Sequence, residues 1–182
     1  MSSNLEKLDL VPPDKVKGFF GSYYPPPELA SHFINNKLEE IYSVKRVHII
    51  VNPFAGKKNG NKIANLISQE LQELKIDSIT YTTEYANHAE KIVSDISFET
   101  GDSLMSVGGD GTISEIITGL LKRKDSSSDS VPLSIVPSGS GNSQANDMEV
   151  ADYLDAMQRM TVGNLRKMDV GKVTFMVDGK EQ

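Results

Sequence analysis

The apolar residues of the chain follow two patterns, short β-branched runs and longer stripes with helical spacing. Four runs, over 46–51, 76–83, 103–107 and 131–136, predict buried strands. The stripes over 63–74, 89–96 and 113–121 predict amphipathic helices between the strands, and Val150, Leu154 and Met157 predict a helix after the fourth strand. Strands that alternate with helices are typical of an α/β fold with a parallel sheet.

The junction between the third strand and its helix is the most informative stretch, Val107–Thr112. Glycine backbones can approach a ligand closely, and a helix N-terminus carries partial positive charge, so this turn is a candidate phosphate site. Asp110 is its one carboxylate, and it suits a general base or a partner of the metal that accompanies a nucleotide. Thr112 and Glu115 have the T-x-x-E spacing of a capping box, which predicts that the helix starts at Thr112. An Asp-Gly hairpin turn is the alternative, but a helix follows rather than a second strand.

Two other loops carry related signals. Asn52–Gly60 follows the first strand and contains glycines and two lysines, without the spacing of a Walker A motif. Taken alone, this loop is equally consistent with a solvated strand-to-helix turn. Pro137–Asn142 follows the fourth strand and combines glycines with hydroxyl and amide donors. Because the carboxyl ends of parallel strands meet at one edge of a sheet, the glycine turns should converge there, and a nucleotide site is the leading interpretation.

The loop after the second strand could face the same edge through Tyr85–His88. His88 by itself is interpreted as a structural hydrogen-bonding residue near a helix start rather than as a catalyst.

Composition and charge narrow the function. The chain has 182 residues, which suits one domain or one domain with appendages. Its net charge of −6 and the lack of a basic patch argue against nucleic-acid binding. The absence of cysteine excludes disulfides and thiolate metal sites, and the three histidines lack metal-ligand spacing, so no metal-ligating residues are predicted. No apolar run is long enough to span a bilayer and Met1–Leu10 lacks a signal-peptide core, which predicts a cytoplasmic protein.

Residues 1–44 read as a polar, proline-punctuated leader. A short amphipathic helix is predicted from Glu28 to Tyr42. Packing against the body of the domain is favoured for it over contact with a membrane, because its apolar face is thin and lysine is sparse.

Three motifs in order resemble the catalytic domain of the diacylglycerol kinase and sphingosine kinase superfamily, over about residues 45–178. They are Asn52-Pro53-x-x-Gly56-Lys57, Gly108–Thr112 and Pro137–Asn142. Thr83-Glu84-x-x-Asn87-His88-Ala89 and Gly119-Leu120-x-x-Arg123-x-Asp125 look like the sphingoid-base and ceramide kinase branch. Gly108, where sphingosine kinases usually carry serine, looks more like diacylglycerol and bacterial lipid kinases.

The resemblance implies an α/β ATP-binding domain with flanking helices over 45–165. Met168–Lys172 resembles the family's crossing point into a β-rich second domain that holds the lipid, so 166–182 is expected to be the start of that domain, truncated here. Asp110 is the implied general base or metal-site carboxylate. The candidate ATP-binding residues are Asn52, Pro53, Phe54, Gly56, Lys57, Thr83, Asn87, His88, Gly108, Gly109, Gly111, Thr112, Gly139, Ser140, Gly141 and Asn142.

The expected function is that of an ATP- and Mg²⁺-dependent lipid kinase, which phosphorylates a hydroxyl of a sphingoid base, ceramide or diacylglycerol at a membrane surface. One alternative is a nucleotide-binding or regulatory truncation without turnover. Another is a soluble-substrate kinase resembling NAD kinase, whose family also carries a Gly-Gly-Asp-Gly turn. Asn52-Pro53 and Ser138–Asn142 favour the lipid branch over the latter.

Overall fold

The computed structural model describes residues 42–125, 130–163, 165, 167–171, 173, 176–177 and 180–181. Four strands form one sheet in the order β2-β1-β3-β4, and every neighbouring pair is parallel. The strands are β1 (Arg46–Val51), β2 (Asp77–Thr82), β3 (Asp102–Gly108) and β4 (Leu133–Pro137). The predicted α/β fold with a parallel sheet is confirmed, with each strand end within two residues of its predicted place.

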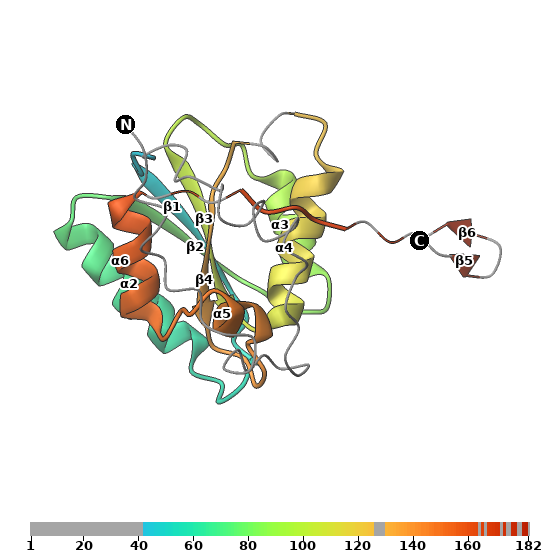
Figure 1. The fold of residues 1–182 in the computed structure, drawn as a ribbon, viewed down its shortest axis with the longest axis horizontal. Helices are drawn as coiled ribbons and strands as arrows, with labels where there is room; N and C mark the ends of the chain where they lie inside the picture. Colours follow the sequence, from blue (N-terminus) through green and yellow to red (C-terminus); the bar gives the residue numbers. More distant parts are fainter. Residues whose placement is uncertain are drawn as a thin grey trace, which may run out of the picture. The chain divides into compact units, whose positions relative to one another are not determined.

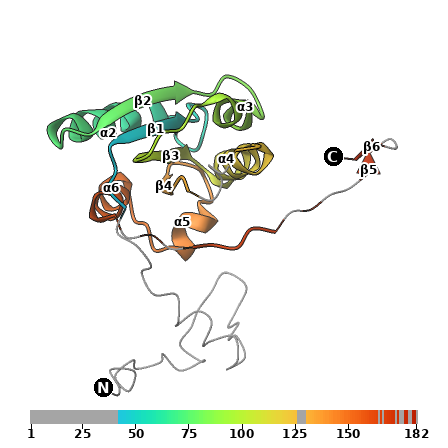
Figure 2. The same cartoon turned by 90° about the horizontal axis from the view of Figure 1, so that it is seen from above.

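Helices cover both faces of this sheet, as Figures 1 and 2 show. α2 (Gly60–Glu73) and α6 (Tyr153–Val162) lie on one face, and α3 (His88–Asp95) and α4 (Asp110–Lys122) lie on the other. Alternate residues of β1 divide between two apolar clusters: Val47, Ile49 and Val51 pack with α2 and α6, while Ile50 packs with α3 and α4. A strand buried on both faces needs the continuous apolar run from which β1 was predicted.

The segment after β4 differs from the expectation of a single helix. It forms two, α5 (Ser143–Asp147) and α6, with Val150 buried between them. α5 has five residues, which is too short to show a helical repeat in the sequence. The start of α6 is set by Asp152, whose carboxylate accepts the N–H groups of Leu154 and Asp155. Its end is set by Gly163 in the left-handed region.

Two expectations concern the segment after α6 and the segment before β1. Within 166–182, the segment expected to be the start of a β-rich domain, the described residues include two short strands. β5 (Met176–Val177) pairs antiparallel with β6 (Lys180–Glu181). Of the helix expected from Glu28 to Tyr42, all residues but Tyr42 lie outside the described part of the chain.

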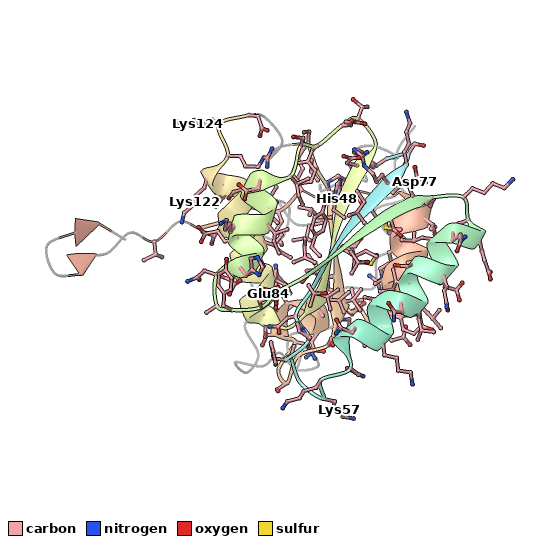
Figure 3. All side chains as sticks on the ribbon, turned by 180° about the vertical axis from the view of Figure 1, so that it is seen from behind. His48, Lys57, Asp77, Glu84, Lys122 and Lys124 are labelled. Carbon is pink, nitrogen blue, oxygen red and sulfur yellow. The ribbon has the colours of Figure 1, made fainter. Side chains whose placement is uncertain are left out.

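A buried polar network holds the amino end of the sheet. The carboxylate of Asp102 accepts hydrogen bonds from Arg46 at 2.7 Å and from the Glu99 N–H at 2.8 Å, and it lies 3.1 Å from Nε2 of His48. His48 is 2% exposed, and Figure 3 shows it inside the molecule. Burial alone would raise the pKa of Asp102, but the hydrogen bonds from Arg46, the Glu99 N–H and His48 outweigh it and hold the pKa below its usual range.

This lowered pKa predicts a contribution to acid stability. Ionised Asp102 stabilises the fold above the pKa of the unfolded chain, about 3.9, and this contribution is lost as the pH falls through the lower folded pKa. Asp102→Asn should lower the free energy of unfolding at pH 7 by about 3 kcal/mol, because it breaks a buried charge network. Urea unfolding between pH 7 and 3 should show a flatter pH dependence for the variant.

Asp77→Asn is the matched control, because Asp77 is exposed at the start of β2 (Figure 3). It should leave stability nearly unchanged. Equal stability of Asp102→Asn and the parent at pH 7 would contradict the role of the network.

Candidate functional site

The strand order places a topological switch point at the centre of the sheet. The chain leaves β1 for β2 on one side and then crosses to β3 on the other side of β1. In open parallel sheets, ligands bind beyond the carboxyl ends of the strands at such a point. The loops after β1 and β3 meet at this edge, which is the lower end of the sheet in Figure 1.

A cavity of about 270 Å³ opens at this edge. Its walls come from the loop after β1, the loop after β2 and the first turns of α4. The residues that line it are Asn52, Phe54, Thr83, Tyr85, Ala86, Thr112 and Glu115. A larger hollow of about 410 Å³ lies between α2 and the start of β2, at the amino end of that strand rather than at the carboxyl edge of the sheet.

Four of the predicted binding residues therefore meet in one cavity: Asn52, Phe54, Thr83 and Thr112. Tyr85, Ala86 and Glu115 line it as well and were missing from the candidate set. The first two could have been found, because the stretch 85–88 was expected to face this edge. Glu115 was assigned to another role, the capping box.

The capping box prediction is wrong in both members. α4 begins at Asp110 with Gly109 as an extended N-cap and no side-chain hydrogen bond at the cap. Thr112 is instead the third residue of the helix. It is buried, and its Oγ1 accepts a hydrogen bond of 3.3 Å from Nδ2 of Asn52. Oδ1 of Asn52 accepts the Phe54 N–H at 3.0 Å, so Asn52 joins the loop after β1 to α4.

Glu115 caps a different helix from its own. Its carboxylate accepts the N–H groups of Asn87 at 2.9 Å and of Ala89 at 3.1 Å, at the start of α3. Asn87, the N-cap of α3, lies in the left-handed region and makes no side-chain capping bond. Glu115 therefore fixes the end of the loop that carries Tyr85 and Ala86.

Removing this carboxylate should loosen the start of α3. We expect Glu115→Ala to lower the free energy of unfolding by about 1–2 kcal/mol, which is typical of a lost helix cap. Amide exchange should accelerate at Asn87 and Ala89, because both N–H groups lose their acceptor. Ser114→Ala, at an exposed neighbouring position of α4, is the control and should change neither measurement. Unchanged exchange at both amides in Glu115→Ala would refute the capping role.

His88 stabilises the loop rather than lining the cavity. Its Nδ1 accepts the Glu84 N–H at 3.0 Å, and its ring stacks on Tyr85 with centroids 4.3 Å apart and planes at 9°. This agrees with the interpretation of His88 as a structural residue.

The glycine turns contact one another, backbone against backbone. A Cβ on Gly139 would lie 2.5 Å from Cα of Gly109, and a Cβ on Gly56 would lie 2.5 Å from the carbonyl oxygen of Ser138. Gly56 also has a φ of +48°. A Cβ on Gly108 would lie 2.4 Å from Oγ1 of Thr112. The fold itself therefore requires these glycines, whether or not a ligand is bound.

Gly111 differs from these glycines. A Cβ placed there would meet no atom within 4 Å. Gly111 is the second residue of α4, where alanine would favour the helix. No contact among the described residues accounts for the absence of a side chain at this position.

The two kinds of glycine predict opposite effects on stability. Gly139→Ala should destabilise the chain by about 2 kcal/mol, because the backbone of Gly109 must move away. Gly111→Ala should be neutral or stabilise it by up to about 1 kcal/mol. Thermal and urea unfolding of the two variants beside the parent would test this difference. A Gly139→Ala variant as stable as the parent would show that the two turns do not need their close contact.

Asp110 connects α4 to α5. Its Oδ2 accepts the Ser143 N–H at 3.0 Å and its Oδ1 accepts the Gln144 N–H at 3.1 Å. These bonds, first the one from Gln144 and then the one from Ser143, lower the pKa of Asp110, so its ionised form is favoured. The preceding turn is closed by Asn142, whose side chain accepts the Gly139 N–H at 2.8 Å and donates to its carbonyl at 2.9 Å.

The remaining predicted residues surround this edge without lining the cavity. Lys57, Ser140 and Gly141 are exposed. Asn87 contributes its backbone N–H to Glu115. The members outside the cavity lining are Pro53, Gly56, Lys57, Asn87, His88, Gly108, Gly109, Gly111, Gly139, Ser140, Gly141 and Asn142.

The Gly119 and Arg123 motif packs α3 against α4 and does not reach the cavity. A Cβ on Gly119 would lie 2.6 Å from the carbonyl oxygen of Glu90. Arg123 donates to the carbonyl groups of Val93 at 2.6 Å and Ser94 at 3.0 Å, and its guanidinium lies 4.8 Å from the ring centroid of Phe98. This motif therefore contributes to the packing of α3 against α4 and not to the lining of the cavity.

Comparison with known proteins agrees with this arrangement. Residues 46–173 match the family model of the diacylglycerol kinase catalytic domain. Sphingosine kinase B of Dictyostelium discoideum is 29% identical over 143 residues, which cover 78% of this chain and 19% of that protein. Mitochondrial acylglycerol kinase of Xenopus laevis is 30% identical over 158 residues, which cover 85% of this chain and 36% of that protein.

A solved structure shows the same fold. The crystal structure of a diacylglycerol kinase from Bacillus anthracis str. Sterne matches with a TM-score of 0.53 and 26% identity, over 64% of this chain and 42% of that chain. The chain thus spans less than half the length of each of these relatives. With a family match that runs from β1 past α6 and glycine turns that meet at one edge of the sheet, the chain belongs to the diacylglycerol kinase catalytic domain family.

Proposed function

We propose that this chain carries the nucleotide-binding part of an ATP-dependent lipid kinase, which transfers the γ-phosphoryl group of ATP to a hydroxyl of a sphingoid base, ceramide or diacylglycerol. The observation that carries the proposal is the cavity at the switch point of the sheet, walled by the loops after β1 and β2 and by the start of α4. The kinase names of its relatives support the reaction class.

Two features at this edge of the sheet suit a nucleotide. Tyr85 is 56% exposed and held in place by its stack on His88, so its free face offers a platform for a base. The first turn of α4 has open space beside Gly111, at a helix end that favours negative charge. A phosphate group beside Gly111 would explain why this position has no side chain.

The donor set fits Mg²⁺ only together with phosphates. The described residues contain no cluster of three or more histidine, aspartate or glutamate side chains. Kinases hold Mg²⁺ through one or two carboxylates and the substrate phosphates, and Asp110 supplies one ionised carboxylate beside the glycine turns. Bound there, Mg²⁺ would neutralise charge on the phosphates.

The environment of Asp110 favours a metal partner over a general base. A general base works best with a pKa near the working pH. The hydrogen bonds from two backbone N–H groups instead lower the pKa of Asp110, further from that pH. Phosphoryl transfer depends mainly on positioning and charge stabilisation, which an ionised carboxylate can support through a cation.

Gly111→Ala should separate binding from stability. The parent should bind MgATP with a dissociation constant on the order of 0.1–1 mM in calorimetry. Gly111→Ala should weaken this binding at least about tenfold, because its methyl group occupies the space proposed for phosphate, while the melting temperature stays the same or rises. Ser114→Ala is the control, since Ser114 is exposed on the same helix but does not line the cavity. Parental ATP affinity in Gly111→Ala would exclude phosphate from this position.

Asp110→Asn should separate the structural role of this carboxylate, as an acceptor for two N–H groups of α5, from its proposed role as a partner of Mg²⁺. Asparagine has one acceptor oxygen for two N–H groups, so the melting temperature should fall. If Asp110 helps to hold Mg²⁺, added Mg²⁺ should improve the ATP affinity of the parent much more than that of the variant. In a longer version that also carries the family's second domain, phosphorylation of sphingosine or diacylglycerol per folded molecule should fall about 10²–10⁴-fold, because the charge stabilisation supplied through the cation is lost. Parental turnover in a folded variant would remove Asp110 from the chemistry.

A further inference from the structure

Asn59-Gly60, the residue pair at the start of α2, is the only place in the sequence where glycine follows asparagine. Asn59 is exposed and occupies the N-cap position of the helix, but its side chain makes no capping hydrogen bond. The side-chain amide carbon of an asparagine is close enough along the chain to the next main-chain nitrogen to close a five-membered ring with it. The amide of Asn59 is not committed to the helix and is therefore available for this reaction.

The fold requires glycine at position 60. A Cβ there would lie 2.8 Å from the carbonyl oxygen of Asn52 and 3.2 Å from Cγ1 of Val51. The absence of a side chain also leaves the Gly60 nitrogen open to approach from the preceding side chain. As the first residue of α2, Gly60 has no intrahelical acceptor, and its N–H forms no hydrogen bond with another described residue.

A hydroxyl group and positive charge surround the Asn59 amide. Its Oδ1 accepts a hydrogen bond of 3.4 Å from Oγ of Ser138, which polarises the amide carbonyl. Three exposed lysines, Lys57, Lys58 and Lys62, flank Asn59 in the sequence, and the residues between them are uncharged. Donors and positive charge stabilise the negative charge that develops when a nitrogen attacks a carbonyl group.

We propose that Asn59 is a site of spontaneous deamidation in the folded chain. The Gly60 nitrogen attacks Cγ of Asn59, a C–N bond forms, and the side-chain nitrogen leaves as ammonia. Water then opens the cyclic imide at either of its carbonyl carbons, which gives aspartate or isoaspartate. The net reaction consumes one water molecule and converts a neutral amide into a carboxylate and an ammonium ion.

The first turn of α2 controls ring closure. The carbonyl group of Asn59 accepts the Ile63 N–H at 3.0 Å. Ring closure requires rotation of the Asn59 ψ angle away from its value of 10°, and this rotation breaks that hydrogen bond. Helix ends open more readily than helix centres, because fewer hydrogen bonds hold them. The reaction should therefore proceed through opening of this turn, without unfolding of the whole chain.

Deamidation would place a negative charge at the carboxyl edge of the sheet. An aspartate at the N-cap of α2 favours the helix, so the fold should persist. Ser138 joins this position to the turn after β4, and Gly139 of that turn contacts Gly109. A carboxylate at position 59 should therefore oppose the phosphates of a nucleotide. This consequence rests on the proposed function, whereas deamidation itself can be measured without nucleotide.

The first test follows the mass of the full chain during incubation at mildly alkaline pH, without nucleotide. The chain should gain one mass unit, and peptide mass spectrometry should place the gain at Asn59, as both aspartate and isoaspartate. Conversion at Asn59 should be at least about tenfold faster than at Asn61 or Asn142, because the residues that follow those two carry a Cβ. Asn59→Gln should remove most of the mass gain, because its longer side chain must close a larger ring.

A parallel incubation in urea shows whether the folded chain permits the reaction. Conversion of Asn59 in the unfolded chain without conversion in the folded chain would overturn the proposal, because the fold would then protect this residue. Equal rates at Asn59, Asn61 and Asn142 in the folded chain would overturn it as well, since the reaction would then owe nothing to Gly60.

Calorimetry with MgATP tests the consequence for the site. Asn59→Asp reproduces the aspartate product and should weaken MgATP binding about threefold or more, while the melting temperature stays the same or rises. Gln69→Glu makes the same change of charge farther along α2 and should leave the affinity unchanged. Parental affinity in Asn59→Asp would overturn the consequence for the site. A parent that does not bind MgATP would count against the proposed function, whereas the mass measurements without nucleotide decide the deamidation.

Discussion

The close approach of Gly109 to Gly139 is the constraint on which the candidate site depends. It brings the turn after β3 against the turn after β4 without an intervening side chain. That contact places Asp110 within hydrogen-bonding distance of the first N–H groups of α5. It also leaves the start of α4 facing the loop after β1, where Asn52 bonds to Thr112. A side chain at either glycine would separate these elements, since backbone atoms cannot move aside as a flexible side chain can.

The carboxyl edge of the sheet is held together by side chains that satisfy the backbone of another element. Asp110 of α4 accepts from α5, and Glu115 of α4 accepts from α3. α4 is therefore the element to which the others at this edge are attached. The amino end of the sheet is organised differently, around one buried carboxylate that draws on Arg46, His48 and Glu99. The amino end is therefore fixed by a charge network. The carboxyl end, which contains the cavity, is fixed by side-chain carboxylates that accept backbone N–H groups of neighbouring helices.

The sequence was sufficient for the strands, the three helices between them and the edge where the site lies. Strands buried on both faces need continuous apolar runs, and this requirement is local enough to read from residue order. The helix cap was misassigned because Glu115 has the spacing of a local cap, while its acceptor atoms reach a helix that precedes it in the chain. α5 was missed because five residues show no repeat. The sequence could not show whether Gly109 and Gly139 serve the fold or a ligand, because that depends on the distance between them. The placement of Asn52, Phe54, Thr83 and Thr112 in the site was predicted from the family resemblance.

The cap supplied by Glu115 has a consequence for the order in which the chain can fold. α3 has eight residues, fewer than an isolated helix needs to persist in water, and its N-cap residue makes no side-chain bond of its own. The N–H groups of Asn87 and Ala89 reach their acceptor, Glu115, only when α4, which comes later in the chain, is in place. During synthesis, α3 would therefore leave the ribosome before the residue that completes it. The wall of the cavity that contains Tyr85 and Ala86 should accordingly form late, after β3 and α4 have docked, as a result of assembly rather than as a starting point for it.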